Sequence, residues 1–282
     1  MTTEKILPEG TPSITPFIVQ ATDKTPAVNF VPDNLYFNIS GNATSHETAE
    51  IFSNAGKWVT NYDKQLDLLQ RENKVQALNL IFEFNLLQAD DASLEAIKGL
   101  LARIELTNSR DVHILVKWHY KSSNEKMKSF LQQYIDGYRI FFETINEMGV
   151  PSFFIHPTDI SPKIFFDTPH GVFRISGSSR PEHPRAFYSQ VDKWIECNGR
   201  QWMMGHPLDI KMRYFNTSST KCLMDILLLV DKIYRAAKPG IVNWHYDVED
   251  TLELETVKEE FEPQVQNLRF NYIPRKGAES TP

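Results

Sequence analysis

The amino-acid sequence predicts a mixed α/β fold, built as two tandem copies of one small domain. Two observations support this prediction: an internal repeat covers most of the chain, and apolar strand and helix patterns alternate in the same order in each copy. We expect each copy to form a mixed, mostly parallel sheet with an N-terminal hairpin and two main helices.

The internal repeat establishes the two copies. Residues 25–59 align with residues 161–195 without a gap, and Trp118-His119-Tyr120 recurs later as Trp244-His245-Tyr246. The second copy is shorter between these anchors, because the first copy has a polar insert at residues 63–76. We therefore predict a first domain at residues 1–147, a second domain at residues 148–274 and a disordered tail at residues 275–282.

Each copy contains the same series of elements. Period-two apolar patterns predict strands at residues 27–31, 35–40, 78–86, 114–120 and 138–142, with counterparts at 163–167, 172–176, 208–215, 241–246 and 268–272. Helical spacing predicts main helices at residues 47–59 and 94–104, with counterparts at 183–197 and 221–236, and a charged helix precedes each last strand. The first two strands are joined by a short turn, which predicts an antiparallel hairpin. The later strands alternate with helices, which predicts parallel pairing.

Composition limits the class of protein. Hydrophobic residues make up 41% and charged residues 23% of the chain, which is typical of a soluble globular protein. The formal net charge of −6, without a basic cluster, argues against nucleic-acid binding. Cys197 and Cys222 have no metal-ligand spacing, which favours a reducing compartment. No apolar run approaches the roughly 18 residues of a membrane span, so we expect a cytoplasmic protein without membrane insertion.

The stretch from Tyr214 to Thr220 lies where a predicted strand ends and a predicted helix begins. Asn216 is followed there by four hydroxyl residues, Thr217, Ser218, Ser219 and Thr220. Such residues are favoured helix N-caps, and we assign the cap to Ser218 or Ser219. A phosphate would also be tolerated at this point, because the first turn has unpaired N–H groups and the positive end of the helix dipole. Local chemistry alone favours a cap without regulation.

The Trp-His-Tyr motif closes a strand in both copies and invites a metal or general-base hypothesis. A metal-assisted hydrolase would use His245, Asp247 and Asp250, but their spacing matches no known ligand loop. The sequence also has no recognisable nucleophile elbow. We therefore expect no catalytic residue, no metal and no cofactor, and we place His119 and His245 at a sheet edge or against a helix.

The second copy resembles the SiaC family of regulatory phosphoproteins over residues 155–273. The resemblance rests on Ser161-Pro162-x-Ile164, Ile175-Ser176-Gly177, Phe187-Tyr188 with Trp194, Tyr214-Phe215-Asn216-Thr217-Ser218-Ser219 and Trp244-His245-Tyr246-Asp247. The first copy, residues 17–145, is similar to the family mainly through its Ile-Ser-Gly and Trp-His-Tyr motifs.

The resemblance implies a non-enzymatic protein of a bacterial partner-switching module. A histidine-kinase-like Ser/Thr kinase would phosphorylate Thr217, and a PPM-type phosphatase would remove the phosphate. The unphosphorylated form would bind and activate a diguanylate cyclase, raising cyclic di-GMP and promoting biofilm. We expect the partner-binding surface to include Asn216, Ser218, Ser219, His245, Tyr246 and Asp247. A constitutive interaction scaffold without phosphoswitching is the alternative.

Two features of this chain depart from the family pattern. Family members usually have one domain, whereas this chain has two. The first copy has also lost the threonine, because either Asp91 or Ala89 stands opposite Thr217, depending on the alignment. Under the first alignment, Asp91 would supply a permanent, weaker negative charge. We therefore expect the first copy to be an unswitched scaffold or binding face and the second copy to be the switch.

Overall fold

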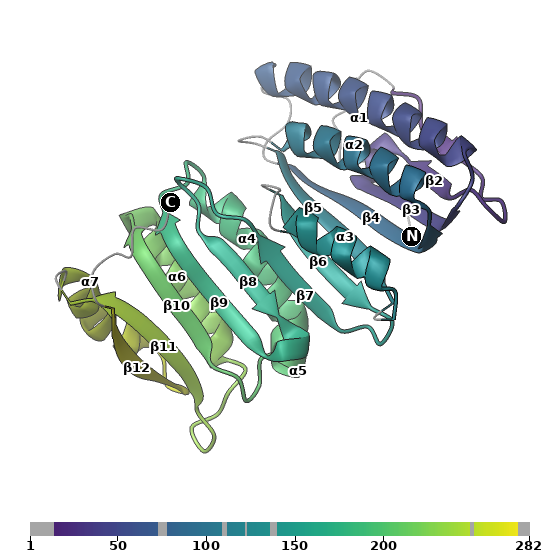
Figure 1. Cartoon of the computed structure of the whole chain (residues 1–282). Helices are drawn as coiled ribbons and strands as arrows, with labels where there is room; N and C mark the ends of the chain where they lie inside the picture. Colours follow the sequence, from purple (N-terminus) through teal and green to yellow (C-terminus); the bar gives the residue numbers. More distant parts are fainter. Residues whose placement is uncertain are drawn as a thin grey trace, which may run out of the picture. The chain divides into compact units, whose positions relative to one another are not determined.

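The computed structural model describes residues 14–72, 78–108, 112–121, 123–135, 140–248 and 251–275 of the chain. The chain divides into two compact units, Met1–Val150 (unit 1) and Pro151–Pro282 (unit 2). Both units have the α/β fold predicted from the sequence, with helices packed on a sheet (Figure 1).

The sheet of unit 1 has the strand order β1-β2-β3-β4-β5-β6. Its strands are β1 (Phe17–Val19), β2 (Ala27–Phe30), β3 (Tyr36–Ala43), β4 (Leu78–Ala89), β5 (Val112–Tyr120) and β6 (Phe141–Asn146). β2 pairs antiparallel with β1 and β3, and a short 3-10 turn, η1 (Pro32–Asn34), joins β2 to β3. β3, β4, β5 and β6 then pair in parallel, because helices connect them. The predicted hairpin and the predicted parallel strands are both confirmed.

The helices of unit 1 are α1 (Glu47–Arg71), α2 (Asp91–Thr107) and α3 (Glu125–Ile135). α1 is longer than predicted, because it continues through much of the polar insert. Tyr62, Leu66 and Leu69 are buried and lie at helical spacing, so they extend the apolar face of the helix. Their spacing was hidden by the charged residues between them.

Aromatic side chains form the core of unit 1 between the sheet and α1. The rings of Trp58 and Tyr62 stack at 5.1 Å between centroids, and both contact Phe37 on β3. Phe37 in turn lies 4.7 Å from Phe82 on β4. A second group joins the other end of the sheet to α3, because Trp118 on β5 contacts Phe130.

The sheet of unit 2 has the strand order β7-β8-β9-β10-β11-β12. Its strands are β7 (Pro151–Ile155), β8 (Lys163–Asp167), β9 (Val172–Ser179), β10 (Leu208–Phe215), β11 (Gly240–Asp247) and β12 (Leu268–Arg275). Its helices are α4 (Pro184–Trp194), α5 (Arg200–Trp202), α6 (Thr217–Asp231) and α7 (Thr251–Thr256), with short helical turns η2 (Thr168–His170), η3 (Ile195–Gly199), η4 (Val257–Phe261) and η5 (Glu262–Gln264). The pairing repeats that of unit 1, with β7, β8 and β9 antiparallel and β9 to β12 parallel.

Two tryptophans organise the core of unit 2. Trp194 at the end of α4 packs on Phe166 and Phe173 of the hairpin. Trp244 on β11 contacts Phe261 of η4, and Trp244 is fully buried. The Trp-His-Tyr motif therefore places its tryptophan in the core of each unit, at Trp118 and Trp244.

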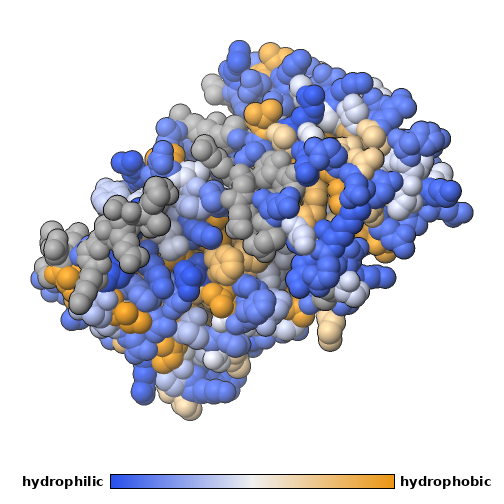
Figure 2. Space-filling model, in the orientation of Figure 1, coloured by the Kyte–Doolittle hydropathy of each residue, from blue (hydrophilic) through white to orange (hydrophobic). Residues whose placement is uncertain are grey.

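The helices of each unit cover only one face of its sheet, as Figure 1 shows for α1 and α2 in unit 1 and for α4 and α6 in unit 2. The opposite face, here called the helix-free face, has polar side chains in register on neighbouring strands. Asn38, Glu83 and Lys117 form such a row in unit 1. Arg174, Asp209 and Asn243 form the equivalent row in unit 2. Figure 2 shows hydrophilic residues over much of the surface in view.

The ends of both last strands differ from the prediction. β6 lies at Phe141–Asn146, later than the predicted strand at residues 138–142, whose residues 138 and 139 lie outside the described part. β12 continues to Arg275, so this residue belongs to the sheet and not to the predicted tail. Arg275 is held there because its Nη2 donates to the backbone oxygen of Met212 at 2.6 Å. Residues 276–282 of that tail lie outside the described residues.

Candidate functional site

The first turn of α6 begins directly after β10 and is capped by Asn216. The Asn216 side-chain oxygen accepts a hydrogen bond from the Ser219 backbone N–H at 2.9 Å. The Asn216 backbone oxygen accepts from the Thr220 N–H at 2.8 Å. The predicted cap at Ser218 or Ser219 is therefore wrong. The extended backbone of Asn216 puts its amide one step before the helix, where a cap must lie, whereas both serines are already helical.

Thr217 and Ser218 occupy the first two helical positions of α6, and both are exposed. The first turn contains no acidic side chain. Lys221 is exposed one turn further along the same helix. An anion attached to Thr217 would therefore face the positive end of the helix dipole, without a neighbouring carboxylate in the first turn to repel it.

Ser219 has a different role from its two neighbours, because its side chain is fully buried. The Ser219 hydroxyl lies 2.9 Å from the Ser179 hydroxyl at the end of β9, and Ser179 lies 2.8 Å from the Tyr188 hydroxyl on α4. These three hydroxyls, here called the hydroxyl network, join two helices and a strand under the first turn of α6. Burial raises the pKa of Tyr188, so its hydroxyl stays protonated and available as a donor. With its side chain held in this network, Ser219 positions the first turn and does not face solvent.

The equivalent turn in unit 1 has the same backbone arrangement. Asp90 caps α2 by accepting from the Ser93 N–H at 2.7 Å, and the Asp90 N–H donates to the Ala43 oxygen at 3.0 Å. The Asn216 N–H donates in the same way to the Ser179 oxygen. These matching hydrogen bonds make Asp90 the counterpart of Asn216. Asp91, the first helical residue of α2, is then the counterpart of Thr217. The alternative alignment with Ala89 is excluded.

Asp91 supplies a negative charge at the position of Thr217. Its side chain is 93% exposed, and its carboxylate lies 2.7 Å from the Lys126 ammonium on α3. Aligning the two Trp-His-Tyr motifs places Leu252 opposite Lys126, so unit 2 has no lysine at that position. Unit 1 therefore carries both a fixed anion and its cation at the site where unit 2 has a neutral hydroxyl.

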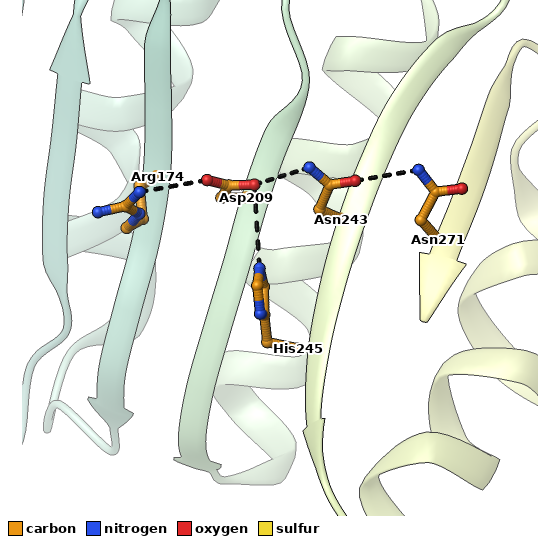
Figure 3. A network of polar contacts seen from close by, with 5 residues as sticks. All are labelled: Arg174, Asp209, Asn243, His245 and Asn271. Atoms are coloured by element: carbon orange, nitrogen blue, oxygen red, sulfur yellow. Dashed lines mark hydrogen bonds and ion pairs between the residues drawn. The ribbon is translucent and has the colours of Figure 1, made fainter. Parts of the chain in front are cut away.

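The second group of predicted residues, His245, Tyr246 and Asp247, lies at the carboxyl end of β11. β10 and β11 are parallel neighbours, so this end meets the start of α6 at the same edge of the sheet. His245 points to the helix-free face, where its Nε2 lies 4.0 Å from an Asp209 oxygen (Figure 3). The prediction that His245 lies on an edge strand of the sheet or against a helix is therefore wrong. β11 is flanked by strands on both sides, and the helices lie on the other face.

The electrostatics around His245 favour its neutral form. Partial burial lowers its pKa, and the nearby Lys211 lowers it further, while Asp209 acts in the opposite direction. In unit 1 the corresponding His119 lies closer to its carboxylate, with 2.7 Å between Nε2 and Glu83. The contact of His245 with Asp209 is therefore much weaker than its counterpart in unit 1.

Sequence reasoning missed the roles of several residues of this region, although Tyr188 and Tyr214 belong to the motifs that carry the family resemblance. Ser179 and Tyr188 are distant from Thr217 along the chain, and a serine and a tyrosine in amphipathic elements give no local signal of a buried network. Tyr214 and Val248 are 54% and 48% exposed at the ends of β10 and β11, although both are apolar. Their exposure at the same edge was visible only in the structure.

A metal site was the alternative hypothesis for His245 and its neighbouring carboxylates. Among the described residues, no three His, Cys, Asp or Glu side chains gather as a metal would need. Asp250, one of the three residues considered for a hydrolase, lies outside the described residues. The helices in the described part of the chain are all too short or too polar to cross a membrane.

Comparison with known proteins finds relatives for both units. The family model of the SiaC family regulatory phosphoprotein matches residues 19–147 and 155–275. An uncharacterized protein of Pseudomonas aeruginosa (strain UCBPP-PA14) is 34% identical over 90 residues, which is 32% of this chain and 71% of that protein.

Two solved structures from Pseudomonas aeruginosa are also similar. One is the diguanylate cyclase SiaD in complex with its activator SiaC, with 30% identity over 43% of this chain and 98% of that chain, and a TM-score of 0.38. The other is apo-SiaC, with 29% identity over 44% of this chain and 98% of that chain, and a TM-score of 0.35. The family model matches twice and covers most of the sequence, so this chain belongs to the SiaC family of regulatory phosphoproteins and contains two copies of its domain.

Proposed function

We propose that this protein regulates partner proteins according to the phosphorylation of Thr217. The observation that supports this most directly is the position of Thr217: it is exposed, it is the first residue of a capped helix, and its first turn has no acidic side chain. Asn216 provides the cap, so the Thr217 hydroxyl is not needed to hold the helix. Modification there would leave the fold intact.

A phosphate on Thr217 would change the partner surface without unfolding α6. It would add nearly two negative charges and three acceptor oxygens at the positive end of a helix. A partner that packs an apolar or acidic surface there would be repelled, and a partner with arginine side chains would be favoured. Tyr214 and Val248 supply exposed apolar area beside this point, which suits the docking of the unphosphorylated form.

We propose Asn216, Ser218, His245, Tyr246 and Asp247 as further parts of the partner surface. The first two lie on the turn that contains Thr217, and the other three end the neighbouring strand β11. Ser219 belongs to the site as a positioning residue, since it holds the turn through the hydroxyl network.

The partners that fit this role are a histidine-kinase-like Ser/Thr kinase, a PPM-type phosphatase and a diguanylate cyclase, all acting in the cytoplasm. The similar SiaC of Pseudomonas aeruginosa is the activator of the diguanylate cyclase SiaD and forms a complex with it. We infer that this chain acts by binding, as that protein does, and not by catalysis.

Unit 1 would be the unswitched copy. Asp91 gives it a permanent single charge where unit 2 has Thr217, and Lys126 already pairs with that charge. Its site is therefore insensitive to a kinase, and unit 1 would present one constant surface while unit 2 alternates between two. A constitutive scaffold, in which neither unit is modified, is the competing function.

Phosphorylation with the cognate kinase, followed by phosphate mapping by mass spectrometry, tests the proposal. We expect one phosphate per chain, on Thr217, and none on a Thr217→Ala variant. Ser218→Ala is the matched control, because Ser218 is the exposed hydroxyl next to the site, and this variant should accept phosphate normally. Label on unit 1, or unchanged label on Thr217→Ala, would rule out the switch at Thr217, and the absence of label on both units would favour the constitutive scaffold.

A further inference from the structure

The helix-free face of unit 2 has a group of basic side chains on neighbouring strands. His245 on β11 lies near three basic residues, Arg174 on β9, Lys211 on β10 and Arg275 on β12. The positive charges of all three act on the His245 ring. Arg174 and Lys211 flank Asp209 on this face, since side chains two residues apart on a strand point the same way. We call these four residues the basic surface.

Polar contacts hold two of the cations in place. The Arg174 guanidinium lies 3.3 Å from Asp209, and Asp209 also accepts from the Asn243 amide at 2.9 Å. Asn271 on β12 donates in turn to the Asn243 oxygen at 3.1 Å, so this row crosses four strands (Figure 3). The Arg275 side chain reaches over β11 to the Met212 backbone oxygen on β10. Part of the entropy that a flexible arginine loses on binding is therefore lost already on folding.

Among the described residues of unit 1, the equivalent face has no such group of cations. The counterparts of Arg174, Lys211 and Arg275 in unit 1 are Asn38, Asn85 and Glu147. Several carboxylates of unit 1 on this face already have partners. Lys117 lies 3.0 Å from Glu143, and Glu83 lies 2.7 Å from His119. The two copies of one fold thus differ in the charge of this face, because unit 2 has three cations where unit 1 has two asparagines and a glutamate.

The state of His245 agrees with an excess of positive charge on this surface. Burial lowers its pKa, and Lys211, Arg275 and Arg174 all lower it further, so they disfavour another cation at this point. Asp209 is the one group that opposes them, and it is shared with Arg174 and Asn243. Burial disfavours a charge of either sign, whereas the part of the shift that comes from the three cations reflects positive charge, which attracts a carboxylate.

We propose that the basic surface of unit 2 binds an acidic segment of a partner protein, and that unit 1 does not bind it. The net charge of the whole chain is −6, so a long nucleic acid would meet repulsion beyond this local cluster, whereas a short acidic segment would not. The cations also lie on three different strands, which suits an extended peptide that crosses the sheet. This binding is independent of Thr217, which lies on the start of α6, whereas the basic surface lies on the helix-free face.

Fluorescence anisotropy of a labelled oligoglutamate peptide, titrated with the full-length chain, tests this inference. We expect saturable binding that weakens with added salt, since the contacts are ionic and exposed to solvent. Lys211→Glu combined with Arg275→Glu should weaken binding at least about ten-fold. Lys64→Glu combined with Lys128→Glu makes the same charge change on exposed helical positions of unit 1 and should leave the affinity within about two-fold.

A gain-of-function variant completes the test, because a second binding site cannot result from damage to the fold. Asn38→Arg, Asn85→Lys and Glu147→Arg together copy the basic surface into unit 1, and the number of peptides bound per chain should rise from one to two. Equal weakening by both pairs of charge reversals would overturn the inference, because only net charge would then matter. Tighter binding of duplex DNA than of the peptide would overturn the choice of a protein partner.

Discussion

The first turns of α2 and α6 share one backbone arrangement and differ in their chemistry. Each is capped by the residue before the helix, Asp90 or Asn216, and each cap holds the N–H of the third helical residue. The first helical residue is a paired carboxylate in α2 and an exposed hydroxyl in α6. The duplicated fold therefore shows that capping does not need Thr217, which leaves this side chain available for regulation.

The two turns also differ in what lies beneath them. The hydroxyl network of unit 2 connects Ser219 to Ser179 and Tyr188, whereas unit 1 has Ala43 and Phe52 at the positions of the last two. Ser93, the counterpart of Ser219, therefore cannot make these hydrogen bonds. Unit 2 fixes the start of its helix to both neighbouring elements, while unit 1 packs apolar groups there. The turn proposed to meet a kinase is the more firmly anchored one.

Removing the centre of the hydroxyl network is expected to give the largest effect on stability. Ser179→Ala leaves the buried Ser219 and Tyr188 hydroxyls without their partner, which should lower the free energy of unfolding of unit 2 by about 2 kcal/mol. Denaturant unfolding measures the loss, and hydrogen–deuterium exchange should locate it at the start of α6.

The matched control is Ser93→Ala in unit 1, at the position of Ser219. Because Ser93 has no Ser179 or Tyr188 counterpart to bond with, this change should cost clearly less than Ser179→Ala. Equal losses in both units would mean that the network adds nothing to the stability of the turn, and unit 2 would not be better anchored than unit 1.

The two caps offer a second comparison, with a different dependence on pH. Asn216→Ala and Asp90→Ala should each cost about 1 kcal/mol at neutral pH, as is usual for an N-cap. Hydrogen bonds from Ser93 lower the pKa of Asp90, so its stabilising effect is complete above about pH 4 and is lost as the pH falls through the lowered value. Asn216 does not titrate.

The free energy of unfolding of both variants, measured over a range of pH, distinguishes the two caps. The cost of Asp90→Ala should shrink in acid, whereas the cost of Asn216→Ala should stay constant over the same range. A constant cost for both variants would show that the Asp90 carboxylate caps no better when ionised, contrary to its hydrogen bonds with Ser93.

Much of this comparison could be predicted from the sequence, because the repeat is visible without a structure. The gapless alignment of residues 25–59 with 161–195 and the two Trp-His-Tyr motifs predicted the duplicated α/β fold, which is confirmed. Periodicity found five of the six strands in each unit, since a strand with one covered face alternates. It missed β1, which has only three residues, and β7, whose five residues are all buried and do not alternate. It failed for the length of α1, where charged residues conceal Tyr62, Leu66 and Leu69.

The site was harder to predict, for physical reasons. Four successive hydroxyls after Asn216 all have cap chemistry, and only the backbone angles show that Asn216 is the residue before the helix. The face to which a histidine points depends on which side of the sheet the helices cover, and this misled the prediction for His245. The hydroxyl network joins residues far apart in sequence, so no local pattern could predict it.

A third prediction concerns the helices behind the two turns. Burial raises the pKa of Asp192 on α4 to about 6, and the neighbouring Asp225 on α6 adds to the increase. Unit 1 has Gly56 at the position of Asp192, so it carries no such charge. Protonated Asp192 therefore favours folding below about pH 4, and this advantage is lost as the pH rises to about 6.

Asp192→Asn should accordingly stabilise unit 2 at neutral pH. The expected gain is about 1 kcal/mol at pH 7, smaller than the full shift implies because solvent screens this partly exposed group. The gain should shrink as the pH falls and disappear below about pH 3, where Asp192 is protonated in the folded and the unfolded chain. A gain of equal size at both values of pH would exclude the charge as its cause.

The smallest effect on stability is expected at Asp91, the residue that defines the difference between the two turns. Its ion pair with Lys126 joins a 93% exposed carboxylate to a 47% exposed side chain, and pairs of this kind contribute about 0.5 kcal/mol or less. Asp91→Thr copies unit 2 into unit 1 and should leave its unfolding nearly unchanged. A double-mutant cycle with Lys126→Ala measures the pair itself. A coupling above about 1 kcal/mol would make the pair a structural contact. A coupling near zero means that Asp91 contributes a charge to the surface and little to the fold, which is the property a permanent substitute for a phosphate requires.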